Sequence, residues 1–492
     1  MKRYIKSKVS LLILPLLIVS SSCTKNFEDI NTDPNNLVSV TPGSLLTPLL
    51  YDIGDYNTTR SYNFTWQLMQ VGFPYPSTAV GTHRYDITPT AGNGTWNKGY
   101  QWLRTIRQIH TSSDEFEQPV YHAVAATLEA LTVGILTDVF GDVPYSEAIK
   151  LDEDISMPKF DSQSDIYKSL IQNLEDANEI YKNSEGIMTG NDFLYENDPD
   201  KWRKFNNSLL LRLLLRTSKK SEMDSYNRIK SILDNPEEYP IFESNEDAAI
   251  LKVSGLDPYE YAWPRRQDYT LNETKAEFFV DFLNEAEDPR RPYFMSEAVT
   301  NDGDTIGYKG IPAAHPSSAS YSFTPSIPNP DLMSPKVVGT IVHHILMSYA
   351  EVEFIKSEVF LHFGNNDKAK AAYKKGVIAG MTHWQWAEDE DFQTPGDSFF
   401  DNAKVKFNNS LERIIEQKYL ALYMNDYQQW FEYRRTGYPV LPKTDEMLHN
   451  GVMPTRLPYH DKLSVFNPEH YKEAVSKLDE GDTPQSKVWW EK

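Results

Sequence analysis

The clearest hydrophobic pattern in the chain is a pair of amphipathic segments between residues 341 and 381. In the first segment, apolar residues recur at three- and four-residue spacing, which places them on one face of a helix: Ile341, Ile345, Tyr349, Val352, Ile355 and Val359. Gly364 can end this helix, and Asn366 or Asp367 can cap a second helix over residues 368–381. Small residues alternate with large aromatic ones in both segments, so the two helix backbones can approach closely. This pattern predicts a tetratricopeptide-type helical pair.

Such a pair needs neighbours to bury its second face, and further segments with helical periodicity supply them. These segments span residues 101–117, 120–140, 165–182, 202–218, 223–233, 275–285, 410–436 and 468–478. Within 202–218, Arg212 and Arg216 lie one turn apart, which predicts a buried helix with one solvent-facing edge. No segment shows the sustained alternation of a strand.

Two stretches interrupt the helical pattern, one near residues 51–100 and one near 247–335. Both are rich in aromatic residues among Gly and Pro, which predicts irregular loops. Loops held on a rigid scaffold usually carry the binding function. We therefore predict a mainly α fold, a tetratricopeptide-type helical-repeat scaffold with a loop-rich ligand face, formed as one domain over residues 43–492.

Composition and charge narrow the class of partner. The 492 residues are 40% hydrophobic, enough for a large core, and carry a formal net charge of −21. An acidic surface of this kind disfavours nucleic acid or an anionic membrane surface as the partner. We expect a large globular protein that does not bind nucleic acid.

The N-terminus has the features of a lipoprotein signal peptide. Residues 1–22 begin with basic residues, continue with an apolar run too short to span a bilayer, and end in small residues before Cys23. Cys23 is the only cysteine, so it has no disulfide partner within the chain. Acyl chains on Cys23 would anchor the protein, although Ser20 departs from the usual Leu of the motif. Residues 23–42 lack periodicity and are interpreted as a flexible tether.

Several segments together resemble a known family. They are FEDINTDPNN (27–36), LTDVFGDVPYSEA (136–148), the helical pair at 341–381, DYQQWFEYRRTGYP (426–439) and MPTRLPYHDKLSVFNPEHYKEAV (453–475). In this order they resemble the SusD/RagB family of outer-membrane lipoproteins from Bacteroidetes, and in particular its SusD-like subgroup. The resemblance covers essentially the whole mature chain.

The resemblance implies a function in nutrient uptake. Members of the family are lipid-anchored at the outer membrane and exposed on the cell surface. They act as a lid on a TonB-dependent transporter of the SusC type, capture an oligosaccharide and deliver it to the transporter, without cleaving it. The alternatives are a peptide-binding component of the RagB kind, or a helical-repeat adaptor that binds proteins and takes no part in nutrient uptake.

Aromatic residues in the two predicted loop regions are the candidates for sugar contacts, because flat rings cover the C–H faces of a sugar and planar polar groups bind its hydroxyls. The candidates are Tyr75, Arg84, Trp96 and Asn97 in the first region, and Tyr261, Trp263 and Arg265 in the second. The competing interpretation is that each aromatic closes its loop onto the scaffold, as most large aromatics do. An ion pair is expected between Asp288 and Arg290.

No sequence motif supports catalysis, a cofactor or a metal. Asp138 and Asp142 could form an acid/base pair, but Asp142 more simply satisfies backbone donors in the turn around Gly141. The adjacent His343 and His344 lack the spacing of a helical zinc pair, and no phosphate-binding loop or nucleophile elbow occurs. The acidic residues at 302, 304 and 388–391 match no calcium-loop spacing. We predict a binding protein, with a glycan-active enzyme as the remaining alternative.

Overall fold

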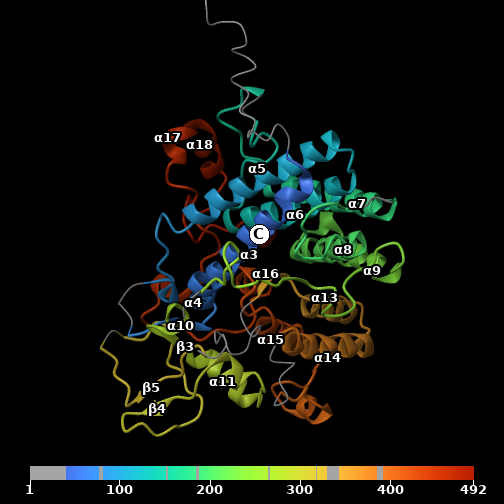
Figure 1. Ribbon diagram of the computed structural model, residues 1–492. Helices are drawn as coiled ribbons and strands as arrows, with labels where there is room; N and C mark the ends of the chain where they lie inside the picture. Colours follow the sequence, from blue (N-terminus) through green and yellow to red (C-terminus); the bar gives the residue numbers. More distant parts are fainter. Residues whose placement is uncertain are drawn as a thin grey trace, which may run out of the picture. The chain divides into compact units, whose positions relative to one another are not determined.

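The computed structural model describes residues 40–76, 81–150, 153–183, 188–263, 266–316, 318–329, 343–384 and 392–492 (Figure 1). Residues Pro42–Lys492 form one compact unit. The predicted signal peptide, Cys23 and Arg265 lie outside the described residues.

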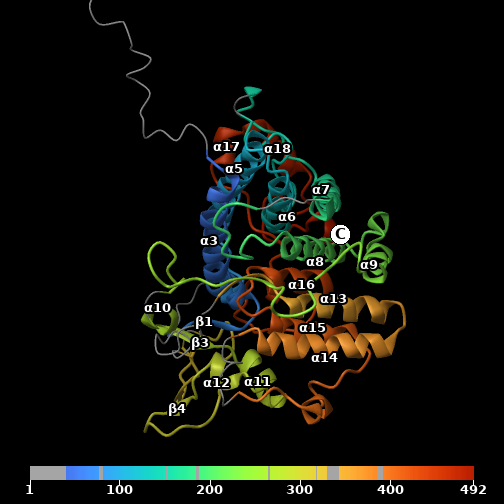
Figure 2. The same cartoon turned by 45° about the vertical axis from the view of Figure 1, so that its right-hand side comes forward.

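The N-terminal half of this unit is built from helices that pack in chain order. Helix α3 spans Pro42–Arg60, α5 Asn93–Glu115, α6 Val120–Phe140, α7 Gln163–Asn183, α8 Pro199–Arg216 and α9 Ser225–Asp234. From α5 to α9 each helix packs against the next, and α3 lies along α5 (Figure 2). Helices α5 and α6 approach closely at Gly99, where an added Cβ would lie 2.5 Å from a Leu136 side-chain atom. The small-residue pattern thus sets how tightly these layers stack.

Helix α6 is the most apolar of these helices. Among the described residues it alone is long and apolar enough to cross a membrane, but 89% of its most apolar window is buried inside the protein. Its apolar surface is therefore covered by neighbouring helices, as in a core helix.

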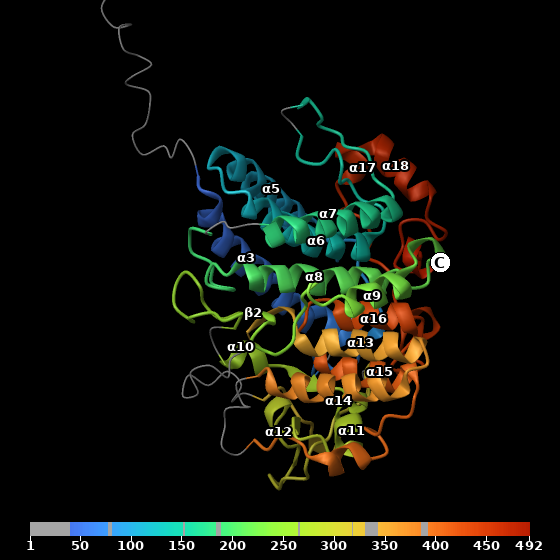
Figure 3. The ribbon, with the colours of Figure 1, turned by 90° about the vertical axis from the view of Figure 1, so that its right-hand side faces the viewer.

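The C-terminal half contains the predicted helical pair. Helix α13 spans Tyr349–His362 and α14 spans Asn366–Thr382, and the two pack along their length (Figure 3). Gly364 has the left-handed conformation expected of it, with φ of 75°. The cap is Asn365, whose side chain accepts a hydrogen bond from the Lys368 amide at 3.1 Å, and not Asn366 or Asp367. The prediction of a mainly α, tetratricopeptide-type scaffold is confirmed.

The prediction of helix from residue 341 onward is wrong at its start. Residues His344–Met347 form strand β6, which pairs antiparallel with β2 (Ala249–Leu251). The helix begins only after Ser348, whose hydroxyl accepts a hydrogen bond from the Glu351 amide at 3.2 Å. All four strand residues are buried, and a short, fully buried apolar run has the same sequence pattern in a strand as in a helix.

The single helix predicted over residues 410–436 is two helices. Helix α15 ends at Ala421 (Leu411–Ala421) and α16 begins at Gln428 (Gln428–Thr436). Between them, Met424 and Asp426 have positive φ values of 64° and 32°. A regular helix excludes such φ values. Non-glycine residues seldom adopt them, so the sequence does not predict this break in the helix.

The irregular regions hold short elements. Strand β1 (Gly72–Pro74) pairs with β3 (Glu273–Lys275), and β4 (Val299–Thr300) pairs with β5 (Phe323–Thr324). The remaining short helices are α4 (Trp66–Leu68), α10 (Arg266–Thr270), α11 (Glu277–Glu285), α12 (Arg291–Phe294), α17 (Leu463–Phe466) and α18 (Pro468–Ser476). A π-helical turn covers Ser61–Thr65, and 3₁₀ turns occur at Thr82–Arg84, Ser221–Met223, Asp397–Asp401, Leu448–Gly451 and Trp489–Glu491.

The first irregular region is shorter than predicted. Helix α3 with its π-helical extension runs through residues 51–65, and α5 already begins at Asn93. The aromatic residues in this part, such as Tyr62 and Trp66, are buried in the core, so tertiary packing stabilises helix despite their modest helix propensity. The Asp288–Arg290 ion pair is present and buried, with 2.6 Å between Oδ2 and the guanidinium.

The predicted solvent-facing edge of helix α8 does not exist. Arg212 and Arg216 are only 5% and 2% exposed. Arg212 binds both carboxylate oxygens of Glu351, at 2.8 and 2.6 Å, and Arg216 binds Glu432 at 2.9 Å. Partners more than 130 positions away in the chain thus neutralise both charges inside the core.

Candidate ligand-binding site

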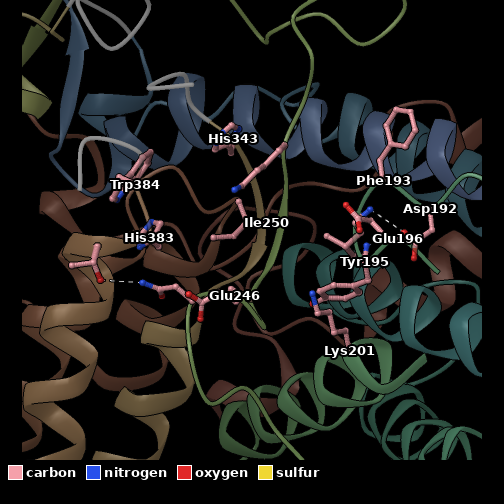
Figure 4. A pocket seen from close by; sticks show the side chains of 15 residues that line it. Asp192, Phe193, Tyr195, Glu196, Lys201, Glu246, Ile250, His343, His383 and Trp384 are labelled. Carbon is pink, nitrogen blue, oxygen red and sulfur yellow. Dashed lines mark hydrogen bonds between the residues drawn. The ribbon is translucent and has the colours of Figure 1, made fainter. Parts of the chain in front are cut away.

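A hollow of about 630 Å³ opens where the loop after α7, strand β2, the start of β6 and the end of α14 meet. We call it the β2 pocket. Figure 4 shows Trp384, His383 and Glu246 on one side of it, Phe193, Tyr195 and Lys201 on the other, and Ile250 and His343 between them. Its size lies in the range of small-molecule sites.

The loop on the Phe193 side is held rigidly. The Asp192 carboxylate accepts hydrogen bonds from the amides of Leu194 at 2.9 Å and Tyr195 at 3.2 Å. It also accepts one from the Trp202 indole at 2.7 Å. Asp192 therefore stabilises the conformation of the loop. In this conformation Phe193 points outward, with 47% of the residue exposed.

Three polar side chains in the pocket have buried atoms without a hydrogen-bond partner among the described residues. They are both ring nitrogens of His343, Nε2 of His383 and Oδ1 of Asn245. Leaving a buried polar atom unpaired costs about 1–3 kcal/mol, so native proteins seldom do so without a reason. Because these atoms are closed to solvent, a ligand hydroxyl or amide in the pocket would supply the missing partners once the side chains turn toward the hollow.

Both histidines are neutral at neutral pH. Burial and, to a smaller extent, the nearby Lys252 together lower the pKa of His343 to about 4. Burial likewise lowers the pKa of His383 to about 4. His383 Nδ1 lies 3.1 Å from the carbonyl oxygen of Ala379, which can only accept, so Nδ1 carries the proton and Nε2 is left as an acceptor. Neutral His343 offers one donor and one acceptor, which matches the dual character of a hydroxyl group.

An aromatic strip continues from the pocket mouth. The Phe193 ring contacts Tyr259 edge-on, with centroids 5.2 Å apart, and Tyr259 contacts Tyr51 at 5.3 Å. The Trp384 ring is only 5% exposed and forms part of the wall. An exposed ring beside unpaired polar atoms is the combination that binds a sugar, with its apolar C–H face and its hydroxyls.

Two of the predicted ligand residues, Tyr75 and Arg84, share a different loop cluster. The Tyr75 ring lies 5.7 Å from His315 and 6.3 Å from Tyr321. Arg84 is buried; its guanidinium donates to the carbonyl oxygen of His315 and lies 3.3 Å from the Glu446 carboxylate. Arg84 thus joins chain segments, while Tyr75 is half-buried and keeps part of its ring accessible.

The other predicted residues are dispersed. Trp96 and Asn97 lie on α5, where Trp96 is 8% exposed and packs 5.2 Å from Phe140, and Asn97 is exposed. Trp263 is 6% exposed and packs 4.9 Å from Tyr62. These burials favour a packing role for both tryptophans, because a covered ring offers no face to a ligand.

Tyr261 is half-buried and its hydroxyl donates to the carbonyl oxygen of Ser254 at 3.4 Å, which closes the loop around Gly255. Arg265 lies outside the described residues. The structure therefore brings together Tyr75 and Arg84 but does not gather the predicted set into one site.

Sequence reasoning missed Phe193, Asn245, His343 and His383 as pocket residues. Phe193 had a detectable signal, since it is an aromatic residue in the polar stretch 190–200. The other three carried none, because their significance lies in unpaired atoms that only the assembled fold reveals.

The acid/base pair considered for Asp138 and Asp142 has structural roles instead. Buried Asp138 accepts hydrogen bonds from the Tyr167 hydroxyl at 2.6 Å and the Trp490 indole at 2.7 Å. Asp142 accepts one from the Gln163 amide at 2.9 Å, at the start of α7. It thus satisfies a backbone donor, as predicted, although at the next helix and not in the Gly141 turn.

Comparison with known proteins places the chain in a family. The sequence model of the SusD-like proteins, described as "Starch-binding associating with outer membrane", matches residues 34–460. The chain belongs to the SusD-like family. No curated protein matches it.

Solved structures share the fold of this SusD-like protein. A SusD homolog from Bacteroides fragilis superposes with a TM-score of 0.79 at 23% identity, covering 92% of this chain and 100% of that one. A chitin-binding protein superposes with a TM-score of 0.76 at 24% identity, covering 91% of this chain and 98% of that one. A protein from Bacteroides vulgatus superposes with a TM-score of 0.76 at 22% identity, covering 92% of this chain and 100% of that one.

Proposed function

We propose that this SusD-like protein is a cell-surface nutrient-binding lipoprotein that captures an oligosaccharide. It delivers the oligosaccharide to a SusC-type TonB-dependent transporter, on which it acts as a lid. Acylation of Cys23 anchors it in the outer membrane. The observation that carries the proposal is the β2 pocket, with an exposed ring beside unpaired polar atoms in a chain of this family. The chitin-binding protein of the same fold supports a carbohydrate as ligand.

Binding in the pocket needs no covalent step. A sugar ring stacks its C–H face on Phe193, while its hydroxyls donate to Asn245 Oδ1 and His383 Nε2 and exchange hydrogen bonds with His343. Each such bond satisfies an atom that is otherwise buried and unpaired, so the pocket gains more from a hydroxylated ligand than from an apolar one.

A peptide is the second candidate ligand, and the charges of the pocket favour it. Lys201 and Lys252 line the hollow together with Glu196 and Glu246, so both signs of charge are present. A neutral glycan uses such groups only as hydrogen-bond partners, whereas a peptide can pair with them as ions. In the part of the chain that the structure describes, no comparable feature favours the helical-repeat adaptor that binds whole proteins.

Isothermal titration of the full chain against a panel of glycans and short peptides tests the proposal, with product formation followed in parallel. We expect saturable glycan binding without turnover. Phe193→Ala should weaken it by about tenfold or more, since truncation of a hot-spot residue costs about 2 kcal/mol or more.

Phe363→Ala is the matched control, because Phe363 is similarly exposed, at 41%, but lies at the end of α13 and not in the pocket. It should leave binding unchanged. Peptide binding alone would replace the glycan with a peptide as the captured nutrient. Turnover, or glycan binding that is insensitive to Phe193, would refute the proposed site chemistry.

A further inference from the structure

Away from the pocket, three metal-ligating side chains meet at the turn between α5 and α6. His110 and Asp114 lie four residues apart on α5, and so on one face, and His122 lies in the first turn of α6. One nitrogen of each imidazole and one oxygen of the carboxylate lie within 4.8 Å of one another. No metal site was predicted from the sequence, because the cluster spans two helices and its spacing matches no motif.

The three groups are already oriented toward each other. His122 Nε2 lies 2.8 Å from Asp114 Oδ1, and the two imidazole rings meet with centroids 4.2 Å apart at an angle of 66°. His122 Nδ1 is buried and has no hydrogen-bond partner among the described residues. The neighbouring Tyr121 is fully buried, which fixes the position of His122 on its helix.

We propose that His110, Asp114 and His122 form a binding site for a zinc-like divalent transition metal ion. Two imidazoles and one carboxylate are a ligand set typical of Zn²⁺ and unsuited to Ca²⁺ or Mg²⁺, which prefer oxygen ligands. A fourth, open position would be filled by water or by a group from another molecule.

The geometry is close to what a tetrahedral ion needs. With ligand bonds of about 2.0–2.1 Å, ligand atoms stand roughly 3.3 Å apart. The two ligand atoms that lie farthest apart, at most 4.8 Å, must therefore move closer together. His122 Nε2 and Asp114 Oδ1, which lie 2.8 Å apart, must separate slightly. His110 and Asp114 are exposed, so rotation of their side chains can make this adjustment without moving the helices.

The charge states also favour a cation. Asp114 supplies a negative charge. The competing interpretation is that Asp114 and His122 form only a surface ion pair that joins the two helices, and that interpretation predicts no metal binding.

Titration of the metal-free full chain, produced without a polyhistidine tag, with zinc chloride tests the inference. We expect one Zn²⁺ per chain, and no binding of Mg²⁺ at the same concentration. Partners that merely orient a metal ligand contribute about 10- to 100-fold in affinity, so His110→Ala or His122→Ala should each weaken binding at least tenfold. Asp114→Asn leaves both imidazoles in place and provides a third, structurally mild variant.

His449→Ala is the control, because His449 is exposed but lies in the turn at Leu448–Gly451. It should leave the affinity unchanged. Co²⁺ in place of zinc should give the visible absorption of tetrahedral coordination, which a surface ion pair alone cannot produce. Absence of stoichiometric binding, or binding equally strong in the His110, Asp114 and His122 variants, would overturn the proposal.

Discussion

Arg435 is the residue whose removal tests most sharply how the core is stabilised. Its guanidinium binds both carboxylate oxygens of Glu358 on α13 at 2.7 Å, and both of Glu432 on its own helix at 3.2 and 2.8 Å. All three side chains are at most 6% exposed. Burial alone would raise the pKa of Glu432. The neighbouring cations Arg435, Lys418 and Arg216 outweigh this effect and hold the pKa well below its usual range. The network is therefore charged inside the core.

The structure indicates what Arg435→Met leaves behind. Glu432 keeps Arg216 at 2.9 Å and Lys418 at 2.8 Å, so it remains neutralised. Among the described residues, Glu358 keeps only the Tyr226 hydroxyl at 2.9 Å and so becomes a buried carboxylate that no described cation pairs with. Breaking a buried pair in this way costs about 3–5 kcal/mol. With an unfolding entropy of about 2.1 cal/mol/K per residue over roughly 450 residues, the midpoint of thermal unfolding should fall by ~4 °C.

The double variant Arg435→Met/Glu358→Met separates charge from packing. It replaces the ion pair by two apolar side chains, and such replacements are often neutral. We expect it to recover most of the stability lost in Arg435→Met, which is a large coupling in a double-mutant cycle. Urea unfolding followed by tryptophan fluorescence, with thermal melts alongside, measures the two single variants, Arg435→Met and Glu358→Met, and the double variant.

The control is Lys230→Met, which removes an exposed pair with Asp234 and should shift the midpoint by less than about one degree. The reasoning is refuted if Arg435→Met is as stable as the wild type, or if the double variant is as unstable as the sum of the two single ones.

Two further predictions rest on the structure and a third rests on the sequence. The amine of Lys275 lies 3.8 Å from the centre of the Trp66 ring, and burial lowers the pKa of Lys275 well below its usual value. Between the pKa of the folded state and the higher pKa of the unfolded state, the unfolded chain therefore binds more protons. The free energy of unfolding should rise with pH across that window. Lys275→Met should abolish this slope in urea melts at graded pH, and an unchanged slope would contradict it. Trp96→Ala should lower stability by about 3–5 kcal/mol while leaving ligand affinity intact, and weakened binding in titration calorimetry would instead return Trp96 to the site. Cys23→Ala should move the protein from the membrane to the soluble fraction after cell disruption, and continued membrane association would exclude a lipid anchor at this residue.

Sequence patterns predicted best the helices whose period is clear. Helix α6 has the predicted bounds, and α14 differs only at its ends. The errors share a physical cause, since each concerns buried chain in which periodicity carries no information. Residues His344–Met347 are buried on both sides as a strand, and Met424 and Asp426 break a helix by backbone conformations that their side chains do not demand.

The ligand site was harder to predict than the fold. Trp96, Trp263 and Phe193 are all aromatic residues with a polar residue within two positions in the sequence, yet of the three only Phe193 is exposed. Which ring stays accessible depends on contacts with distant segments, such as Phe140 beside Trp96. The unpaired atoms of Asn245, His343 and His383 come from three separate parts of the chain, so no local pattern could have joined them.

A buried charged residue, Arg212, connects the helical core to the wall of the β2 pocket. Arg212 binds Glu351 in the first turn of α13 and also donates to the carbonyl oxygen of Leu346 at 3.1 Å, in strand β6. Strand β6 in turn pairs with β2 and follows His343, so this one guanidinium connects α8 to the wall of the pocket. An apolar side chain at position 212 could fill the same volume but could not hold a strand and a helix at fixed distances. The buried Arg212–Glu351 pair therefore positions the strand next to His343 and Ile250, which line the hollow, and purely apolar packing would not supply this positional role.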